Sequence, residues 1–382
     1  MNPDWTVNAY EALRPLLFRL TDAEQAHNAA VWAGRQATGH PALLGLLDRL
    51  YNSHDGVLHT DFLGMHFRSP VGLAAGFDKN YVLTDLTPHL GFGFHEGGST
   101  TARAGKGNDG ERLWRLPEDR AIINRMGLNN CGADAAYEGL KPKEHAIPVG
   151  VNIAKTHDPK IMGDGAIEDF CYSFRRMYPV ADYIVLNISC PNTGDGRTFE
   201  DPVALAELLS AINQCRMDCG NEYHNRTPAL LKVSPDLDFP AFDDVIGVSE
   251  DYGINGHVIG NTTKDRGGLK TGPEQLARMQ GGLSGPQLKG KSLEMIRHAY
   301  RHINEPNIIG VGGIFTPEDA VEKILAGASA VEVLTGMVYE GPGFPSYLNR
   351  GIAKALRRRS FNSVNDAVGQ EIYFHTLSLI HI

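Results

Sequence analysis

The sequence predicts an α/β protein, a (β/α)8 TIM barrel with an N-terminal helical extension, because short apolar strands and helical stretches alternate over about 280 residues. Eight runs have strand character, and their continuous apolar composition is typical of parallel strands that are covered on both faces. No Gly-x-Gly-x-x-Gly motif follows the first strand, which argues against the alternative, a doubly wound open sheet. We expect the extension over residues 1–60, the barrel over 61–360 and a tail of unknown role over 361–382.

The first 50 residues predict three helices. Apolar residues recur at helical spacing between Tyr10 and Leu20. Thr21 and Glu24 have the spacing of a capping box, which predicts Thr21 as the N-cap of the second helix. Gly39-His40-Pro41 ends that helix, and a short leucine-rich helix is expected over 42–50.

The barrel elements follow in order. The eight predicted strands are Val71–Phe77, Gly91–Ser99, Ile147–Ala154, Tyr183–Ser189, Ala229–Ser234, Gly256–Asn261, Ile308–Ile314 and Ala330–Thr335. Helices are expected between most of them, including Ile167–Tyr178, Pro202–Cys215, Ser292–His302 and Pro317–Leu325. Thr316 is the expected N-cap of the last of these helices, with Pro317 at its first position. The active site of such a barrel lies at the C-terminal ends of its strands.

Composition excludes several classes of protein. The 36 Lys and Arg and 45 Asp and Glu give a net charge of −9, which argues against nucleic acid as the main partner. The five cysteines have no disulfide-framework spacing and complete no set of metal ligands, so we expect a reducing compartment and no metal. We find no apolar run long enough for a membrane span and no cleavable signal sequence, which leaves attachment to a membrane surface open.

Polar side chains gather at the predicted strand ends. They are Lys79, Asn152, Asn187, Lys232, Asn261 and Thr262. A single Asn in an apolar strand is usually structural, but amide and ammonium groups at several strand ends favour a ligand site. Because a buried Lys needs a partner for its charge, Lys79 and Lys232 together predict a bound anion or an electron-rich ring.

Glycines follow the last two strands. The Gly-Val-Gly-Gly run at 310–313 and the pair Thr335-Gly336 lie where barrels bind phosphate with the loops after strands seven and eight. The alternative is that these glycines only form tight turns. A phosphorylated cofactor is expected, and amide-rich strand ends with one Lys suit the polar edge of a flavin.

Six motifs carry a resemblance to a known family. They are Ala74-Ala75-Gly76-Phe77-Asp78-Lys79, Ile123-Asn124-Arg125-Met126-Gly127-Leu128-Asn129-Asn130, Asn187-Ile188-Ser189-Cys190-Pro191-Asn192-Thr193, Asn261-Thr262-Thr263, Gly281-Gly282-Leu283-Ser284-Gly285 and Gly310-Val311-Gly312-Gly313-Ile314. In this order the chain resembles dihydroorotate dehydrogenase, the FMN enzyme of pyrimidine synthesis, from about Tyr10 to Gly343.

The resemblance implies a role for each matching residue. FMN would be held by Ala75, Gly76, Lys79, Ser99, Asn152, Asn187, Lys232, Gly260, Gly285, Gly313, Leu334 and Thr335. Dihydroorotate would be held by Lys79, Asn124, Arg125, Met126, Gly127, Leu128, Asn187, Asn192, Asn261 and Thr262. Amides match a ring that carries both N–H and C=O groups, and Lys79 can neutralise the carboxylate of this substrate.

The implied reaction converts dihydroorotate to orotate. A proton leaves carbon 5 and a hydride leaves carbon 6 for the flavin, so a base must face the ring. Cys190 occupies the base position of the family. A buried Cys is usually an inert small hydrophobe, but within this motif we expect Cys190 to act as a thiolate base.

The electron acceptor divides this family. The quinone-dependent class 2 has an N-terminal helical extension and usually Ser as base, whereas class 1 resembles a bare barrel with Cys. This chain combines the extension with Cys190, and it has Leu128 where class 2 usually has Phe and Leu334 where Tyr is frequent. We weight the extension more and expect a quinone as acceptor, with His27 and Arg115 lining its tunnel.

The extension also predicts where the protein acts. Its apolar faces suit a membrane surface, which predicts a peripheral membrane protein on the cytoplasmic side of a bacterial inner membrane, or alternatively at the mitochondrial inner membrane. The alternative for these helices is that they merely pack on the barrel.

Three other functions stay open at this point. The first is a class 1-like enzyme that uses a soluble acceptor such as fumarate. The second is an FMN barrel acting on other nucleobases, and the third is a non-catalytic binding barrel.

Overall fold

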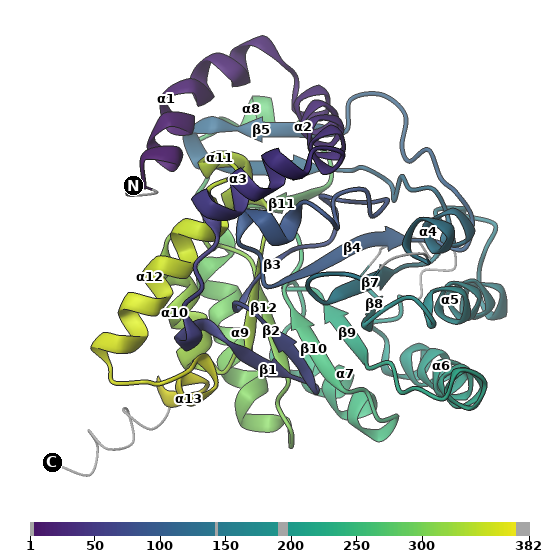
Figure 1. The fold of residues 1–382 in the computed structure, drawn as a ribbon. Coiled ribbons are helices and arrows are strands. Elements are labelled where there is room, and N and C mark those ends of the chain that lie inside the picture. Colours follow the sequence, from purple (N-terminus) through teal and green to yellow (C-terminus); the bar gives the residue numbers. More distant parts are fainter. Residues whose placement is uncertain (1–3, 142–143, 190–197, 372–382) are drawn as a thin grey trace, which may run out of the picture.

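The computed structural model describes residues 4–141, 144–189 and 198–371, and its centre is a closed barrel of eight parallel strands (Figure 1). The strands are β3 (Val71–Leu73), β4 (Phe94–Thr100), β7 (Val149–Ile153), β8 (Tyr183–Asn187), β9 (Ala229–Val233), β10 (Gly256–Ile259), β12 (Ile308–Val311) and β13 (Ala330–Val333). Each pairs with its neighbour along the chain, and β13 pairs with β3 to close the ring. The predicted barrel is confirmed and the open sheet is excluded.

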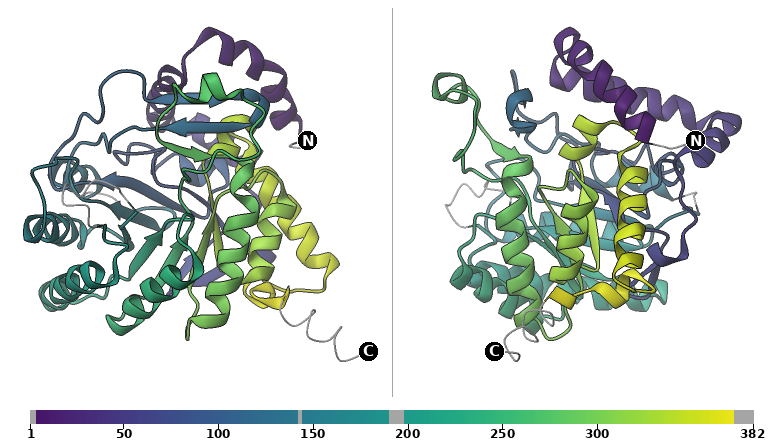
Figure 2. Two further views of the ribbon diagram at one scale, coloured as in Figure 1. Left: turned by 180° about the vertical axis from the view of Figure 1, so that it is seen from behind. Right: turned by 90° about the vertical axis from the view of Figure 1, so that its left-hand side faces the viewer.

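Helices surround the barrel (Figure 2). They are α4 (Ala133–Leu140), α5 (Asp164–Met177), α6 (Pro202–Tyr223), α7 (Phe239–Asp251), α9 (Lys289–His302), α10 (Pro317–Ala326) and α12 (Phe344–Arg358), with the shorter α8 (Pro273–Leu276), α11 (Thr335–Glu340) and α13 (Val364–Ala367). Four 3₁₀ turns connect elements: η1 (Gly56–Leu58), η2 (Thr87–Leu90), η3 (Pro117–Asp119) and η4 (Pro286–Leu288). The predicted cap of α10 is confirmed, since Thr316 accepts a hydrogen bond from the Asp319 amide at 3.2 Å.

A hairpin closes the end of the barrel at which the strands begin (Figure 1). Its strands are β1 (Thr60–Phe62) and β2 (Met65–Phe67). Phe62 and Phe67 are buried in one apolar cluster with Phe94 and Tyr183 from the starts of barrel strands, and the rings of Phe67 and Phe94 stack at 4.5 Å. Because this end is filled, a ligand has access only from the opposite end.

Three N-terminal helices lie at that opposite end, as predicted: α1 (Asp4–Leu20), α2 (Ala23–Thr38) and α3 (Pro41–Tyr51) (Figure 1). The Tyr10 hydroxyl donates to the Val338 carbonyl at 2.9 Å and fixes α1 to α11. Helix α2 approaches the barrel closely at Gly34, where a Cβ would lie 2.6 Å from Leu83 Cδ2. The helices are therefore part of the wall of the barrel mouth.

Two local predictions were wrong. Asp22, and not Thr21, is the N-cap of α2 and accepts from the Gln25 amide at 2.7 Å. The Thr21 hydroxyl instead donates to the Leu17 carbonyl at the end of α1. Strand β4 begins at Phe94 and not at Gly91, because Gly91 has φ +91° and ends the preceding turn in the left-handed region.

A second sheet, which was not predicted, lies beside the barrel mouth. It is antiparallel and consists of β5 (Leu113–Leu116), β6 (Ala121–Asn124) and β11 (Gly282–Ser284). Just before β5, Arg112 forms a bidentate ion pair with Glu24 of α2, with Nη2 at 2.6 Å from Oε1. The sheet thus ties the N-terminal helices to the mouth.

Candidate active site

A cavity of about 1160 Å³ extends from the barrel mouth to the N-terminal helices. Asn187 and Lys232 of the barrel line it, and so do His27 and Ala30 of α2. Its lining includes every described residue predicted for the site except Asn152 and Gly260. Cys190 and Asn192 lie outside the described residues. One cavity therefore serves both the strand ends and the helical extension.

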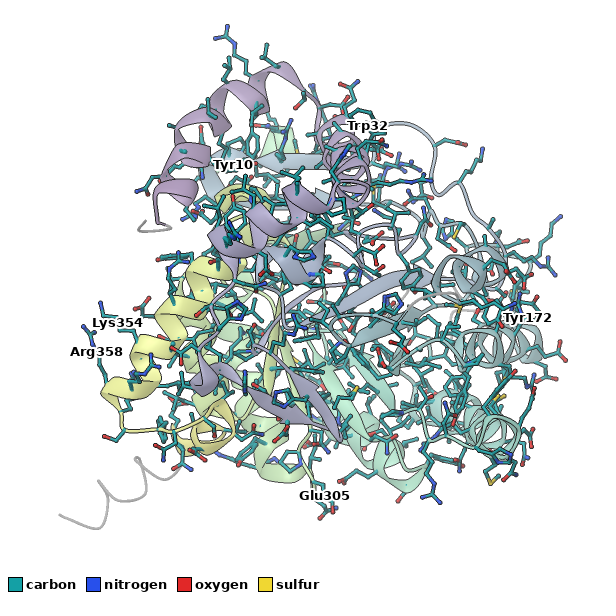
Figure 3. The ribbon with its side chains drawn as sticks, in the orientation of Figure 1. Tyr10, Trp32, Tyr172, Glu305, Lys354 and Arg358 are labelled. Atoms are coloured by element: carbon teal, nitrogen blue, oxygen red, sulfur yellow. The ribbon has the colours of Figure 1, made fainter. Side chains whose placement is uncertain are left out.

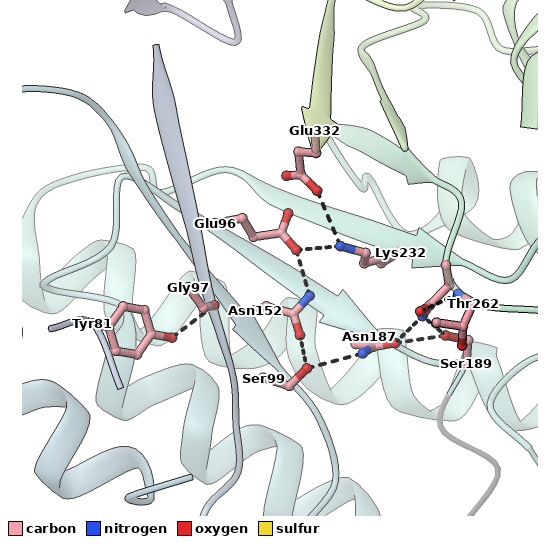
Figure 4. A network of polar contacts seen from close by, with 11 residues as sticks. Tyr81, Glu96, Gly97, Ser99, Asn152, Asn187, Ser189, Lys232, Thr262 and Glu332 are labelled. Carbon is pink, nitrogen blue, oxygen red and sulfur yellow. Dashed lines mark hydrogen bonds and ion pairs between the residues drawn. The ribbon is translucent and has the colours of Figure 1, made fainter. Parts of the chain in front are cut away.

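A chain of hydrogen bonds orders the polar strand ends (Figure 4). Asn261 Nδ2 donates to Ser189 Oγ at 2.6 Å, and this hydroxyl donates to Asn187 Oδ1 at 2.9 Å. Asn187 Nδ2 donates to Ser99 Oγ at 3.2 Å, which in turn donates to Asn152. These contacts give each amide a fixed orientation toward a ligand.

Asn152 and Gly260 do not line the cavity themselves but lie next to residues that do. Asn152 is fully buried between Ser99 and Glu96, whose Oε1 accepts from its Nδ2 at 2.9 Å. Gly260 has φ +121°, and a Cβ there would lie 2.4 Å from the Val311 carbonyl oxygen. Their direct contact with FMN stays a prediction.

Lys232 is paired with two buried carboxylates (Figure 4). Its Nζ lies 2.8 Å from Glu96 Oε1 and 3.4 Å from Glu332 Oε2. Burial lowers the pKa of Lys232, but both glutamates outweigh it and the net shift is upward. The charge of Lys232 is therefore balanced within the protein, so Lys232 itself does not require the bound anion or electron-rich ring that was expected from Lys79 and Lys232 together. Sequence reasoning missed Glu96 and Glu332, although a Glu within each of two apolar strands was a signal.

Lys79, unlike Lys232, does fit the expectation of a bound anion or an electron-rich ring. Its Nζ donates to the Gly76 carbonyl at 2.8 Å, and no carboxylate in the described part of the chain lies within ion-pair distance. Burial lowers the pKa of Lys79 to about 8, and Glu24 only partly offsets this. A desolvated cation that lines the cavity is a strong site for an anionic ligand.

Residues that follow the last two barrel strands, β12 and β13, line the cavity. Gly312 and Gly313 after β12 and Leu334 and Thr335 after β13 all line it. Gly76 faces the same space at φ +103°, where an added Cβ would meet only Leu334 Cδ1, at 3.6 Å. Open glycine positions beside two loops that hold phosphate in many barrels fit a flat phosphorylated cofactor.

Residues 124–128 form one wall of the cavity, beyond β6. Asn124, Arg125, Met126, Gly127 and Leu128 all line it. The Arg125 carbonyl accepts from Asn108 Nδ2 at 2.6 Å, which fixes this segment. Leu128 has φ +55°, an uncommon conformation for a residue with a side chain.

His27 and Arg115 lie at the part of the cavity formed by the extension. The His27 ring meets Phe77 edge to face at 5.1 Å, and burial lowers the pKa of His27 to about 3. Arg115 donates to the carbonyls of Phe18 and Thr21, and its guanidinium lies 4.3 Å from the Phe18 ring centroid. Both polar groups line a part of the cavity whose other lining residues on α1 and α2 are mostly apolar.

One cluster of possible metal ligands, Asp243, His298 and His302, lies on α7 and α9 and does not line the cavity. The two His rings stack at 4.1 Å with an interplanar angle of 24°. Their nitrogen lone pairs are thus nearly parallel and do not converge on one ion, so the cluster adds nothing to this site.

The fold and the site define a flavin-binding type of (β/α)8 barrel with a cavity that continues into a helical extension. Comparison with known proteins agrees: a profile of the dihydroorotate dehydrogenase family matches residues 57–356. The chain belongs to the dihydroorotate dehydrogenase family, whose members are flavoenzymes and oxidoreductases.

Individual relatives cover nearly the whole chain. A protein of Nocardia farcinica named dihydroorotate dehydrogenase (quinone) is 41% identical over 364 residues, which is 95% of this chain and 97% of that protein. A protein of the same name from Gloeobacter violaceus is 40% identical, covering 95% and 99%. The crystal structure of the Eimeria tenella enzyme in complex with ferulenol has a TM-score of 0.82 at 31% identity, covering 92% of this chain and 96% of that one.

Proposed function

We propose that this protein oxidises dihydroorotate to orotate in pyrimidine biosynthesis, with FMN as cofactor and a membrane quinone as final electron acceptor. The observation that carries the proposal is the single cavity that joins the amide-lined strand ends to the apolar pocket under α2. The relatives named as quinone enzymes support it, since they span both the extension and the barrel.

The residues present fit FMN. Lys232 provides a positive charge at the cavity floor, and the Asn187 amide and the backbone after the last two strands provide donors. Gly76 provides room, since an added Cβ there would meet only Leu334 Cδ1, at 3.6 Å. When bound, FMN supplies a ring that accepts a hydride and passes electrons on singly or in pairs. The protein holds and orients this ring and excludes water from it.

The substrate is held by charge and by amides. Lys79 is the cation available to the carboxylate of dihydroorotate, while Asn124, Asn187 and Asn261 offer amides to its ring. These four groups come from four different segments of the mouth, at the ends of β3, β6, β8 and β10. Such fixed groups would hold the substrate ring in one orientation relative to the cofactor.

Cys190 is the proposed base, and it removes the proton from carbon 5. Only the thiolate accepts a proton, so the rate depends on the fraction of Cys190 that is ionised. Cys190 directly follows Ser189 in the sequence, and the Ser189 hydroxyl donates to Asn187 and accepts from Asn261.

Replacing His27 with Asn is expected to raise the KM for a quinone without slowing reduction of the flavin by dihydroorotate, because His27 belongs to the part of the cavity that α2 lines. Its folded pKa of about 3 also predicts a pH effect. The unfolded chain takes up a proton near 6.5, so His27 lowers stability progressively as the pH falls from there toward 3. Stopped-flow kinetics and denaturant titrations at several pH values check both. If the KM for the quinone were unchanged in H27N, His27 would not contribute to quinone binding.

The outward face of the extension is the proposed membrane contact. Leu16, Leu20 and Trp32 are 57%, 70% and 65% exposed, and Trp32 lies on the outer side of α2 (Figure 3). In the described part of the chain, no helix combines the length and the apolar character needed to cross a bilayer. We propose a peripheral attachment on the cytoplasmic side of a bacterial inner membrane.

The double substitution Leu16→Glu and Leu20→Glu is expected to reduce binding to phospholipid vesicles at least tenfold, since it puts two charges into the apolar contact. Turnover with a water-soluble quinone analogue should stay near wild type. The matched control is the double substitution Val203→Glu and Met217→Glu on α6, where the two side chains are 64% and 51% exposed. Vesicle flotation measures the effect, and equal flotation of all three proteins would disprove the attachment site.

A further inference from the structure

The centre of the barrel holds three charged side chains from three strands (Figure 4). Glu96 on β4, Lys232 on β9 and Glu332 on β13 are 0%, 4% and 1% exposed. Two carboxylates and one ammonium sum to a net charge of −1 if all three are ionised. A net charge that is closed off from water is costly, so this cluster requires a further positive charge or a proton.

The hydrogen bonds show which carboxylate oxygens of the cluster have no donor. Lys232 and Asn152 both donate to Glu96 Oε1. Within the described residues, Glu96 Oε2 and Glu332 Oε1 have no donor. Burial raises the pKa of Glu332 well above its ordinary value, and the charge of Glu96 and a direct carboxyl contact with it raise it further against the effect of Lys232. Two close carboxyl groups commonly hold one proton between them.

Other titratable groups near the pair do not supply the charge. They are His95 on β4, Tyr183 on β8 and Tyr81 after β3. Burial lowers the pKa of His95 and raises the pKa of both tyrosines, so all three are neutral at pH 7. Lys232 is thus the cation that the pair faces.

We propose that Glu96 and Glu332 share one proton and that this proton keeps the cluster with Lys232 neutral directly beneath the cofactor site. The proposal rests on the proposed FMN site, because Lys232 and Glu332 line the same cavity. When the pair loses its proton to solvent at higher pH, the cluster becomes negative and opposes the transfer of electrons to the ring. Glu332 is therefore a positioning residue that sets how the midpoint potential of the cofactor depends on pH.

Glu332→Gln tests this, because it removes the titrating carboxyl group, keeps its shape and leaves Lys232 and Glu96 as a neutral pair. Infrared spectra of the apoprotein at pH 7 should contain the C=O band of a protonated carboxyl group in wild type, and this band should be lost in E332Q. Glu96→Gln, which removes the other half of the pair, should lose the same band. Glu305→Gln is the matched control, since Glu305 is exposed at the far end of the barrel (Figure 3).

The FMN-loaded proteins give the second readout. Over the pH range in which the pair loses its proton, the midpoint potential should fall more steeply with pH in wild type than in E332Q. Absence of the band from wild type would overturn the shared proton, and equal slopes would overturn its effect on the cofactor. A chain that binds no FMN would refute the proposed function instead, while the infrared result would still decide whether the proton is shared.

Discussion

Lys232→Met lowers the free energy of unfolding of the apoprotein by about 3–5 kcal/mol and abolishes retention of FMN, because Glu96 and Glu332 then lose their buried cation. Removing one partner of a buried ion pair destabilises a protein far more than replacing the whole pair with well-packed apolar side chains. Chemical denaturation and flavin absorbance of the purified protein measure the two effects.

The controls for this prediction use the same cluster. K232M combined with both E96Q and E332Q should recover part of the stability, since no carboxylate is then left without its cation. Lys160→Met, at an exposed position, should behave as wild type. Wild-type stability of K232M itself would mean that the three side chains do not form a charged cluster in solution.

Cys190→Ala slows reduction of the bound flavin by dihydroorotate about 10²–10⁴-fold, the usual contribution of a positioned base. FMN content should not change. In wild type the rate should rise with pH toward the ordinary thiol pKa of about 8.5 and then level off, because only the thiolate accepts the proton. Anaerobic stopped-flow measurements across pH follow both quantities.

Cys131→Ala is the matched thiol control, as Cys131 does not line the cavity. It should keep the wild-type rate and pH profile. If C190A reduced its flavin as fast as wild type, Cys190 would not be the base, and the proton would have to leave through another group of the mouth.

Much of the site followed from sequence because a parallel barrel brings its strand ends together whatever lies between them. Lys79, Asn187 and Asn261 were found in this way, and the structure places all three on one cavity. Glu96 and Glu332 were missed because their partner Lys232 lies 136 and 100 positions away, and a Glu within an apolar strand signals that it needs a partner without indicating which one.

The sheet formed by β5, β6 and β11 was missed for a related reason. Its strands have three or four residues each, and Ser284 pairs with Ile122 across 162 positions of the chain. A pattern of alternating residues cannot be recognised over so short a run. The capping error at Thr21 is smaller: an adjacent Asp satisfied the same helix end equally well.

The most direct test of the account is the choice of electron acceptor by the FMN-loaded enzyme with dihydroorotate as donor. Initial rates should be measured with a quinone analogue, with fumarate and with NAD⁺ under the same anaerobic conditions. A cavity that continues from the strand ends to the apolar pocket under α2 predicts rapid turnover with the quinone and at most a trace with the other two. Turnover with fumarate and none with quinones would contradict it.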